Sequence, residues 1–216
     1  MTASDAATTD QETIANQSSE PDSGPLAGDP SLIGVPTFVV GSIALGMTLA
    51  GFVPAEAVGA PVAIILAATG IGQLVAALWA AGTGQSAVAS IFGIFSGFWL
   101  SYGFLVLGLT HDWFGVPAES ATATQAVFLT SWLIAVALLA VATLRLPAAY
   151  TVLFTLIAVA LALVLIATVQ DSVQLKAIGG YVVFSFAALG GYLFLHVMSE
   201  ATGGRGLPLG RPVLGA

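Results

Sequence analysis

Six apolar runs separated by short polar breaks occupy the chain from about residue 33 to residue 198. Each run is close to the ~20 residues that an α-helix, rising about 1.5 Å per residue, needs to cross about 30 Å of hydrocarbon. No charged residue lies near the middle of any run. Helices satisfy their own backbone hydrogen bonds in lipid, and the alternating pattern of a membrane β-barrel is not visible. The sequence therefore predicts an all-α membrane protein with six transmembrane helices, at 33–53, 58–81, 87–109, 125–145, 150–169 and 175–198.

The composition supports a membrane protein and argues against several other classes. Of the 216 residues, 57% are hydrophobic and 7% are charged, whereas about a quarter are charged in a typical soluble domain. There is no basic stretch that would suit a nucleic acid, and no cysteine for disulfides, thiolate catalysis or thiolate metal sites. The spans contain no carboxylate pair, histidine cluster or glycine-rich phosphate loop. We expect neither an enzyme nor a cofactor or metal site.

The charges divide the chain into a membrane domain and two tails. Residues 1–28 are acidic and rich in Ser, Thr and Ala, which predicts a disordered acidic tail that is not a signal peptide. The six-helix domain is expected at 29–200 and a short C-terminal tail at 201–216. With six spans, both termini share a side with the basic residues Arg145, Arg205 and Arg211. The positive-inside rule then places both termini in the cytoplasm of a multi-pass protein of the plasma or inner membrane.

The third run carries two contrasting faces in the stretch SIFGIFSGFWLSYG, residues 90–103. On a helix the small residues fall within about 80° of one another, and the bulky residues fall opposite. Small residues let another helix approach closely, so periodicity favours a packing face backed by a lipid face. A pore plugged by the bulky face is the alternative. The small face comprises Ser86, Ser90, Gly93, Gly97 and Ser101, and the bulky face Ile91, Phe95, Phe98 and Tyr102.

Four segments resemble the acetate uptake transporter family, the small acetate/succinate permeases of bacteria and fungi. FGIFSGFWL at 92–100 is similar to the motif of the family's third helix, where Phe95 replaces a usual Tyr and Ser96 a usual Gly. DPSLIGVPTF at 29–38 resembles the helix-1 signature. Gln73 in the second run and LPLG at 207–210 also match. The resemblance covers about residues 29–210, and its matching residues in the first and third helices are Pro30, Gly34, Phe38, Gly84, Gln85, Ser86, Phe92, Phe98 and Trp99.

This resemblance implies a hexamer of six-helix protomers, each with its own pathway for small monocarboxylates or dicarboxylates. By position, a constriction in that pathway is formed by Phe38, Phe95 and Leu156, and a one-residue shift of the fifth helix would exchange Leu156 for Ile157. The stretch at residues 90–103 of the third helix then supplies part of the constriction, through Phe95. The expected partners are a small carboxylate, membrane lipid and further copies of the chain.

A carboxylate in a dry pore needs hydrogen-bond donors in place of water. The spans hold no central Arg or Lys, so hydroxyls, amides and backbone N–H groups remain. The candidates within the pore are Ser42, Gln73, Ser90, Ser96 and Thr155. The entrance motif of the first helix, formed by Asp29, Pro30, Ser31 and Gly34, could present free N–H groups to an anion. Asp29 stands where the family has Asn, and a carboxylate there would repel an anion.

Three functions are consistent with these features. The leading one is a transporter or channel for acetate and related carboxylates, with succinate and proton coupling left open. The second is a structural or regulatory membrane protein that keeps the fold without transport, which the altered first-helix signature allows. The third is a transporter of another small solute, for which Asp29 is less of a handicap.

Overall fold

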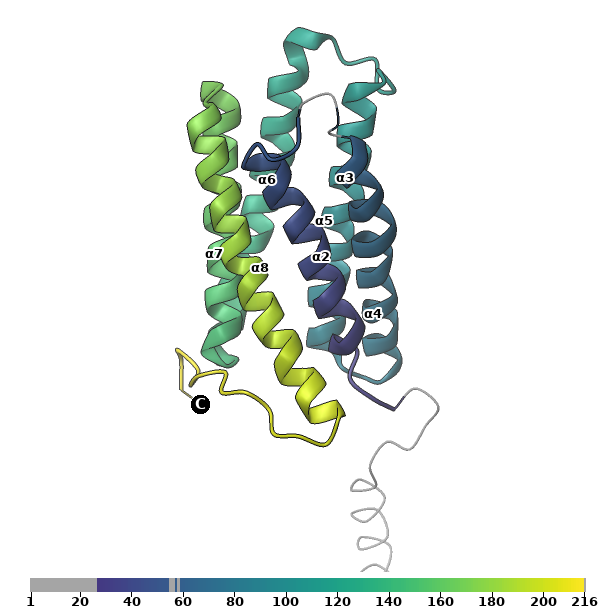
Figure 1. The fold of residues 1–216 in the computed structure, drawn as a ribbon, viewed down its shortest axis with the longest axis vertical. Helices are drawn as coiled ribbons and strands as arrows, with labels where there is room; N and C mark the ends of the chain where they lie inside the picture. The colour runs from purple at the N-terminus through teal and green to yellow at the C-terminus, as the bar shows by residue number, and fades with distance from the viewer. Residues whose placement is uncertain (1–26, 55–56, 58, 216) are drawn as a thin grey trace, which may run out of the picture.

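The computed structural model describes residues 27–54, 57 and 59–215. Its helices run roughly along the long axis of one bundle (Figure 1). Six helical segments are long and apolar enough to cross a membrane, and the described residues contain no strand. The prediction of an all-α, multi-pass membrane protein with six spanning helices is therefore confirmed. The elements are α2 (Ser31–Leu49), α3 (Gly59–Ala63), the π-helix η2 (Ile64–Gly70), α4 (Ile71–Gly82), α5 (Ser86–Thr110), η3 (Ala118–Ser120), α6 (Ala121–Ala142), η4 (Thr143–Arg145), α7 (Ala148–Gln170) and α8 (Val173–Ala201).

Local sequence sets where these segments begin and end. The Asp29 carboxylate accepts a hydrogen bond of 2.8 Å from the backbone N–H of Ser31, which caps the start of α2. Asp171 ends α7 in the left-handed conformation, with φ of 50°. Ser172 follows directly and accepts from the N–H of Leu175, which caps α8. The α7–α8 connection is therefore a tight turn, and the two helices run antiparallel side by side.

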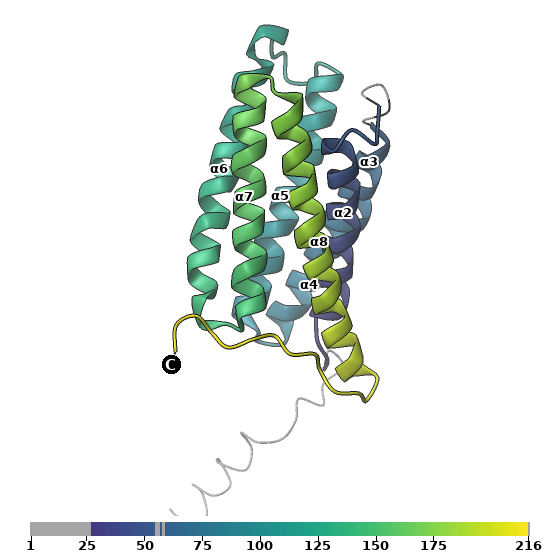
Figure 2. The same cartoon turned by 60° about the vertical axis from the view of Figure 1, so that its left-hand side comes forward.

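The segments form a ring around an aromatic core. Helix α2 packs most extensively on α8, α8 packs on α7, and α7 on α6. On the other side α2 contacts η2 and α4, α4 packs on α5, and α5 touches α6 to close the ring. Figure 2 shows α6, α7 and α8 side by side, with α5 behind them and α2 beyond α8. The buried side chains, among them Phe38, Phe95, Trp99 and Phe186, gather inside this ring.

Glycines bring α2 and α8 into close contact. A Cβ atom added at Gly180 of α8 would lie 2.6 Å from the backbone N of Ala50 and 3.1 Å from its Cα, so only a hydrogen fits there. At Gly190, a Cβ would lie 2.9 Å from the Val39 side chain of α2. Small residues at such crossings let membrane helices gain van der Waals contact where burial from water offers little.

The face of α5 that points inward is the bulky one, contrary to the expectation from periodicity. Phe95 and Phe98 are buried in the core, whereas Ser86 and Ser90 are exposed on the outer surface. The expectation of a lipid-facing aromatic surface on this helix is therefore wrong. Lipid and protein core are both apolar, so the pattern shows two faces without showing which of them is inside.

Helix α2 begins at the same end of the bundle at which α8 finishes and the C-terminal segment runs (Figure 1). That segment crosses below α7 and α8, where the N–H of Ala149 donates to the carbonyl of Leu209 at 2.9 Å. The Tyr192 hydroxyl donates to the carbonyl of Pro208 at 2.7 Å. The expected acidic tail at 1–28 lies outside the described residues except for residues 27 and 28. The domain limits at 29–200 and 201–216 stay predictions.

Candidate functional site

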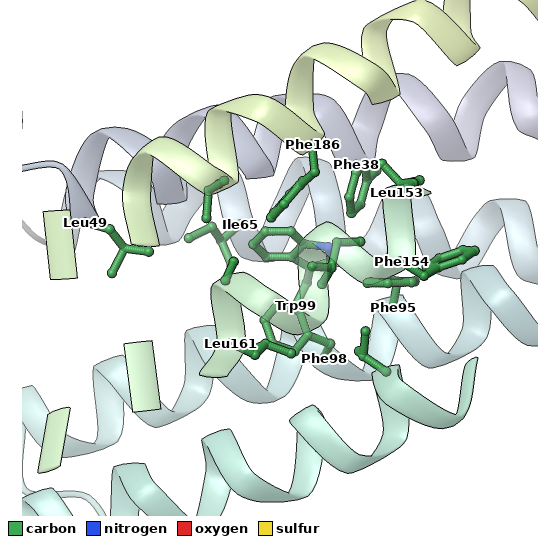
Figure 3. Close-up of a cluster of buried hydrophobic side chains, with 14 of the residues drawn as sticks. Phe38, Leu49, Ile65, Phe95, Phe98, Trp99, Leu153, Phe154, Leu161 and Phe186 are labelled. Carbon is green, nitrogen blue, oxygen red and sulfur yellow. The ribbon is translucent and has the colours of Figure 1, made fainter. Parts of the chain in front are cut away.

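Phe38 of α2 and Phe95 of α5 meet at the centre of the ring. Their ring centroids are 5.5 Å apart and their planes are inclined by 76°. Phe154 of α7 stacks on Phe95 at 5.7 Å, and Phe186 of α8 lies 5.7 Å from Phe38. Figure 3 shows these four rings together with Trp99 in one buried cluster. We refer to the first two residues as the Phe38–Phe95 pair.

The Phe38–Phe95 pair separates two cavities, because both side chains line both of them. The first cavity has a volume of about 200 Å³ and lies towards the end of the bundle where α2 begins. The second has a volume of about 50 Å³ and continues towards the opposite end. The pair therefore occupies the position of a constriction between two spaces inside the ring.

Two further cavities continue the series to the far end of the bundle. The third, of about 100 Å³, shares Leu49 and Tyr102 with the second. The fourth, of about 230 Å³, shares Gln125, Thr168 and Lys176 with the third. Along α7 the lining residues advance from Tyr150 in the first cavity to Thr168 in the third and fourth, and along α8 they advance in the reverse order. The four cavities thus follow the bundle from end to end.

The polar groups are unevenly distributed along this series. In the first cavity they are Ser31, Gln73 and Tyr150, among apolar side chains. Gln73 donates through Nε2 to the carbonyl of Gly34 at 3.0 Å, and its buried Oε1 has no partner in the described structure. The amide orientation follows from this contact, because a flipped amide would place two acceptors together. The fourth cavity is more polar, with Thr122, Gln125, Thr168, Asp171, Ser172 and Lys176 among its lining residues.

Several predicted pore residues lie away from all four cavities. Ser42 is buried and donates to the carbonyl of Phe38 in its own helix. Ser96 donates to the carbonyl of Gly70 at 2.9 Å and so ties α5 to the π-helix. Ser90 and Thr155 are exposed on the outer surface. Of the five polar candidates, Gln73 alone lines one of the four cavities described above.

Among the residues predicted in the fifth helix and at the entrance, some line a cavity and others do not. Leu156 is half-buried and lines none of these cavities, whereas its neighbour Ile157 lines the second. In the entrance motif, Ser31 reaches the first cavity. Asp29 and Pro30 form the capped start of α2 outside it. Gly34 contributes the carbonyl that holds Gln73.

Sequence reasoning did not place some of the residues that line these cavities: it expected Tyr150 and Lys176 at the membrane interface. Trp99 belongs to the matched motif of the third helix, and it lines the second cavity. Phe154 and Tyr150 line the first cavity, and Lys176 lines the third and fourth. The available signal was the position of each on a helix face: Trp99 follows Phe95 by four residues, and Tyr150 precedes Phe154 by four, so each pair shares a face. In the described part of the chain no group of His, Asp and Glu could hold a metal ion.

Comparison with known proteins identifies the family. Residues 13–203 match the model of the GPR1/FUN34/yaaH family. The chain belongs to this family. The resemblance to acetate uptake transporters seen in the sequence motifs is thereby confirmed. Among solved structures, the GPR1/FUN34/yaaH fold of this chain is similar to the bacterial acetate channel SatP, with a TM-score of 0.75 and 22% sequence identity over 85% of this chain and 99% of that one. Comparison with curated proteins gives no match.

Proposed function

We propose that the chain is a membrane channel or transporter for acetate and related small carboxylates, which pass through the four cavities and between Phe38 and Phe95. The observation that carries this proposal is the ordered series of cavities inside one protomer, interrupted at one aromatic pair. Membership of the GPR1/FUN34/yaaH family and a fold shared with an acetate channel support the choice of solute.

The apolar lining favours passage of the acid together with its proton. A charged carboxylate loses its hydration between the Phe38–Phe95 pair, and the rings offer nothing in return. The neutral acid avoids most of this cost. Its O–H group can donate to Gln73 Oε1, the unpartnered acceptor in the first cavity. If the neutral acid is the species that passes, each acid carries its own proton. A proton gradient then drives uptake without a separate proton relay.

The finer features of the proposal have their own support. The first cavity, at about 200 Å³, has room for a dicarboxylate such as succinate as well as for acetate. Lys176 lines the third and fourth cavities and offers an ammonium group at the far mouth, where the fourth cavity is also lined by Asp171. Each protomer holds a complete series, which favours one pathway per protomer. The small residues exposed on α5 suit close packing of protomers in a hexamer. The arginines lie at the end of the bundle that holds both termini, which favours a protein of the plasma or inner membrane whose termini face the cytoplasm.

Uptake of labelled acetate into proteoliposomes tests the proposal. We expect saturable uptake above that of protein-free liposomes, competition by propionate and succinate, and stimulation by an inward proton gradient. At fixed total acetate, the protein-dependent rate should rise with falling pH, on the order of tenfold per pH unit while the neutral acid is scarce. Folded protein that gives the same uptake as protein-free liposomes would remove acetate from consideration. The structural and other-solute alternatives would then lead.

A further inference from the structure

The indole N–H of Trp99 is a buried donor without an acceptor. The side chain is 1% exposed, and Nε1 has no hydrogen-bond partner in the described residues. Nearly all buried polar groups in proteins are hydrogen-bonded, so such an atom calls for an explanation. The indole nitrogen is a donor only. Whatever completes its hydrogen bonding must therefore carry an acceptor.

Trp99 stands directly beyond the constriction. It follows Phe95 by four residues on the same face of α5 and lines the second cavity. Figure 3 shows its indole nitrogen on the side of the ring that faces Phe38 and Phe95. A solute that has just passed between these two rings enters the space beside this N–H group.

Two aromatic rings pack against the indole of Trp99 among the described residues. The Phe98 ring lies 5.0 Å from the indole and the Phe38 ring 6.3 Å, measured between centroids. An N–H directed at an aromatic face is a weak hydrogen bond that an oxygen acceptor readily replaces. Tyr102, the other polar residue of the lining, is placed one turn further along α5. The cavity of about 50 Å³ exceeds the roughly 10–15 Å³ that one water molecule needs.

We propose that Trp99 binds the transported acid, its Nε1–H donating a hydrogen bond to a carboxyl oxygen in the second cavity. This inference rests on the proposed function and names the group that receives the solute after the constriction. The ligand class is a small aliphatic carboxylic acid. Its carbonyl oxygen accepts the bond in both the neutral and the ionised form, and its short chain contacts the apolar lining. Tyr102 lines the second and third cavities and is the next polar group on the way out.

The indole N–H signals of the wild-type protein test the proposal directly. The chain has four tryptophans, Trp79, Trp99, Trp113 and Trp132. With ¹⁵N-labelled indole in lipid nanodiscs, Trp99→Phe identifies its signal. Acetate should move the Trp99 proton signal downfield saturably, with a midpoint matching that of uptake. Trp132 packs against Phe98 in the same aromatic cluster but lines none of the four cavities, so its signal is the internal control.

Transport by the variants supplies the second readout. Trp99→Phe should raise the half-saturating acetate concentration by roughly tenfold, whereas Trp132→Phe should leave it unchanged. Saturable uptake by wild-type protein without a shift of the Trp99 signal would overturn this inference and leave the proposed function intact. An acetate-dependent Trp99 shift in protein that fails to transport would support the binding site and overturn the proposed function instead.

Discussion

Shortening both Phe38 and Phe95 to leucine is expected to raise acetate uptake by up to about tenfold. The two rings form an edge-to-face contact at 5.5 Å, and such a pair is worth about 0.5–1.5 kcal/mol beyond its buried area. If a solute must part the rings to pass, their removal lowers the barrier by about that amount, and about 1.4 kcal/mol corresponds to tenfold in rate. Leucine keeps the site apolar and limits the loss of packing. Initial rates in proteoliposomes measure the effect.

Acids of different chain length give a second comparison between the double variant and the wild-type protein. Propionate and butyrate should gain more than acetate, because a wider constriction matters most for the larger solute. Phe184→Leu is the matched control, since this phenylalanine packs against Gly46 at the periphery and lines none of the four cavities. Equal rates for the double variant and the control, with both proteins folded, would show that the Phe38–Phe95 pair does not limit passage.

Adding a single methyl group at Gly180 should destabilise the bundle by about 2 kcal/mol, because overpacking of this kind costs about 1–3 kcal/mol. The new Cβ would lie 2.6 Å from the backbone nitrogen of Ala50, directly after α2, and backbone cannot rotate away as a side chain can. For a chain of this size, such a loss lowers the midpoint of thermal unfolding by about 4–8 °C. Thermal unfolding of Gly180→Ala in detergent measures it.

Gly191→Ala is the matched control on the same helix. A Cβ at Gly191 meets no described atom within 4 Å. The higher helix propensity of alanine should therefore leave this variant unchanged or stabilise it by up to about 1 kcal/mol. We therefore expect a loss of stability at Gly180 and no loss at Gly191. A Gly180→Ala protein as stable as Gly191→Ala would mean that α2 and α8 are not in close contact at that point.

The spans were predictable from sequence because the bilayer imposes a length on each helix. The ends differ by a few residues where local capping intervenes: the first span ends at Leu49 rather than residue 53, and α6 begins at Ala121 rather than residue 125. Such ends depend on single turns, which hydropathy does not detect. The expectation that Phe38 and Phe95 lie together came from the family motif, and the structure brings the two rings into contact.

The orientation of single side chains was much less predictable. Leu156 and Ile157 differ by about 100° on an apolar helix, and hydrophobicity gives no reason to prefer either as the lining residue. The hydroxyls of Ser42 and Thr155 bond to carbonyls in their own helix, which removes them from the pool of free donors. Ser96 finds its acceptor in η2, a π-helix that nothing in the sequence indicated. These contacts depend on tertiary structure.

The central claim, a solute pathway through the interior of the protomer, is tested most directly by placing a cysteine at each of two neighbouring positions. The chain has no cysteine of its own, so Ile157→Cys introduces a lone thiol into the second cavity and Leu156→Cys introduces one outside the cavities. Each variant is treated with a small neutral thiol reagent, and acetate uptake is measured before and after.

The account predicts that the thiol of the Ile157→Cys variant is modified and that uptake then falls by about tenfold or more, an added barrier of about 1.4 kcal/mol. The Leu156→Cys variant should transport normally after modification. Unimpaired uptake by the modified Ile157→Cys protein, or a block in the Leu156→Cys protein alone, would contradict a pathway between these helices.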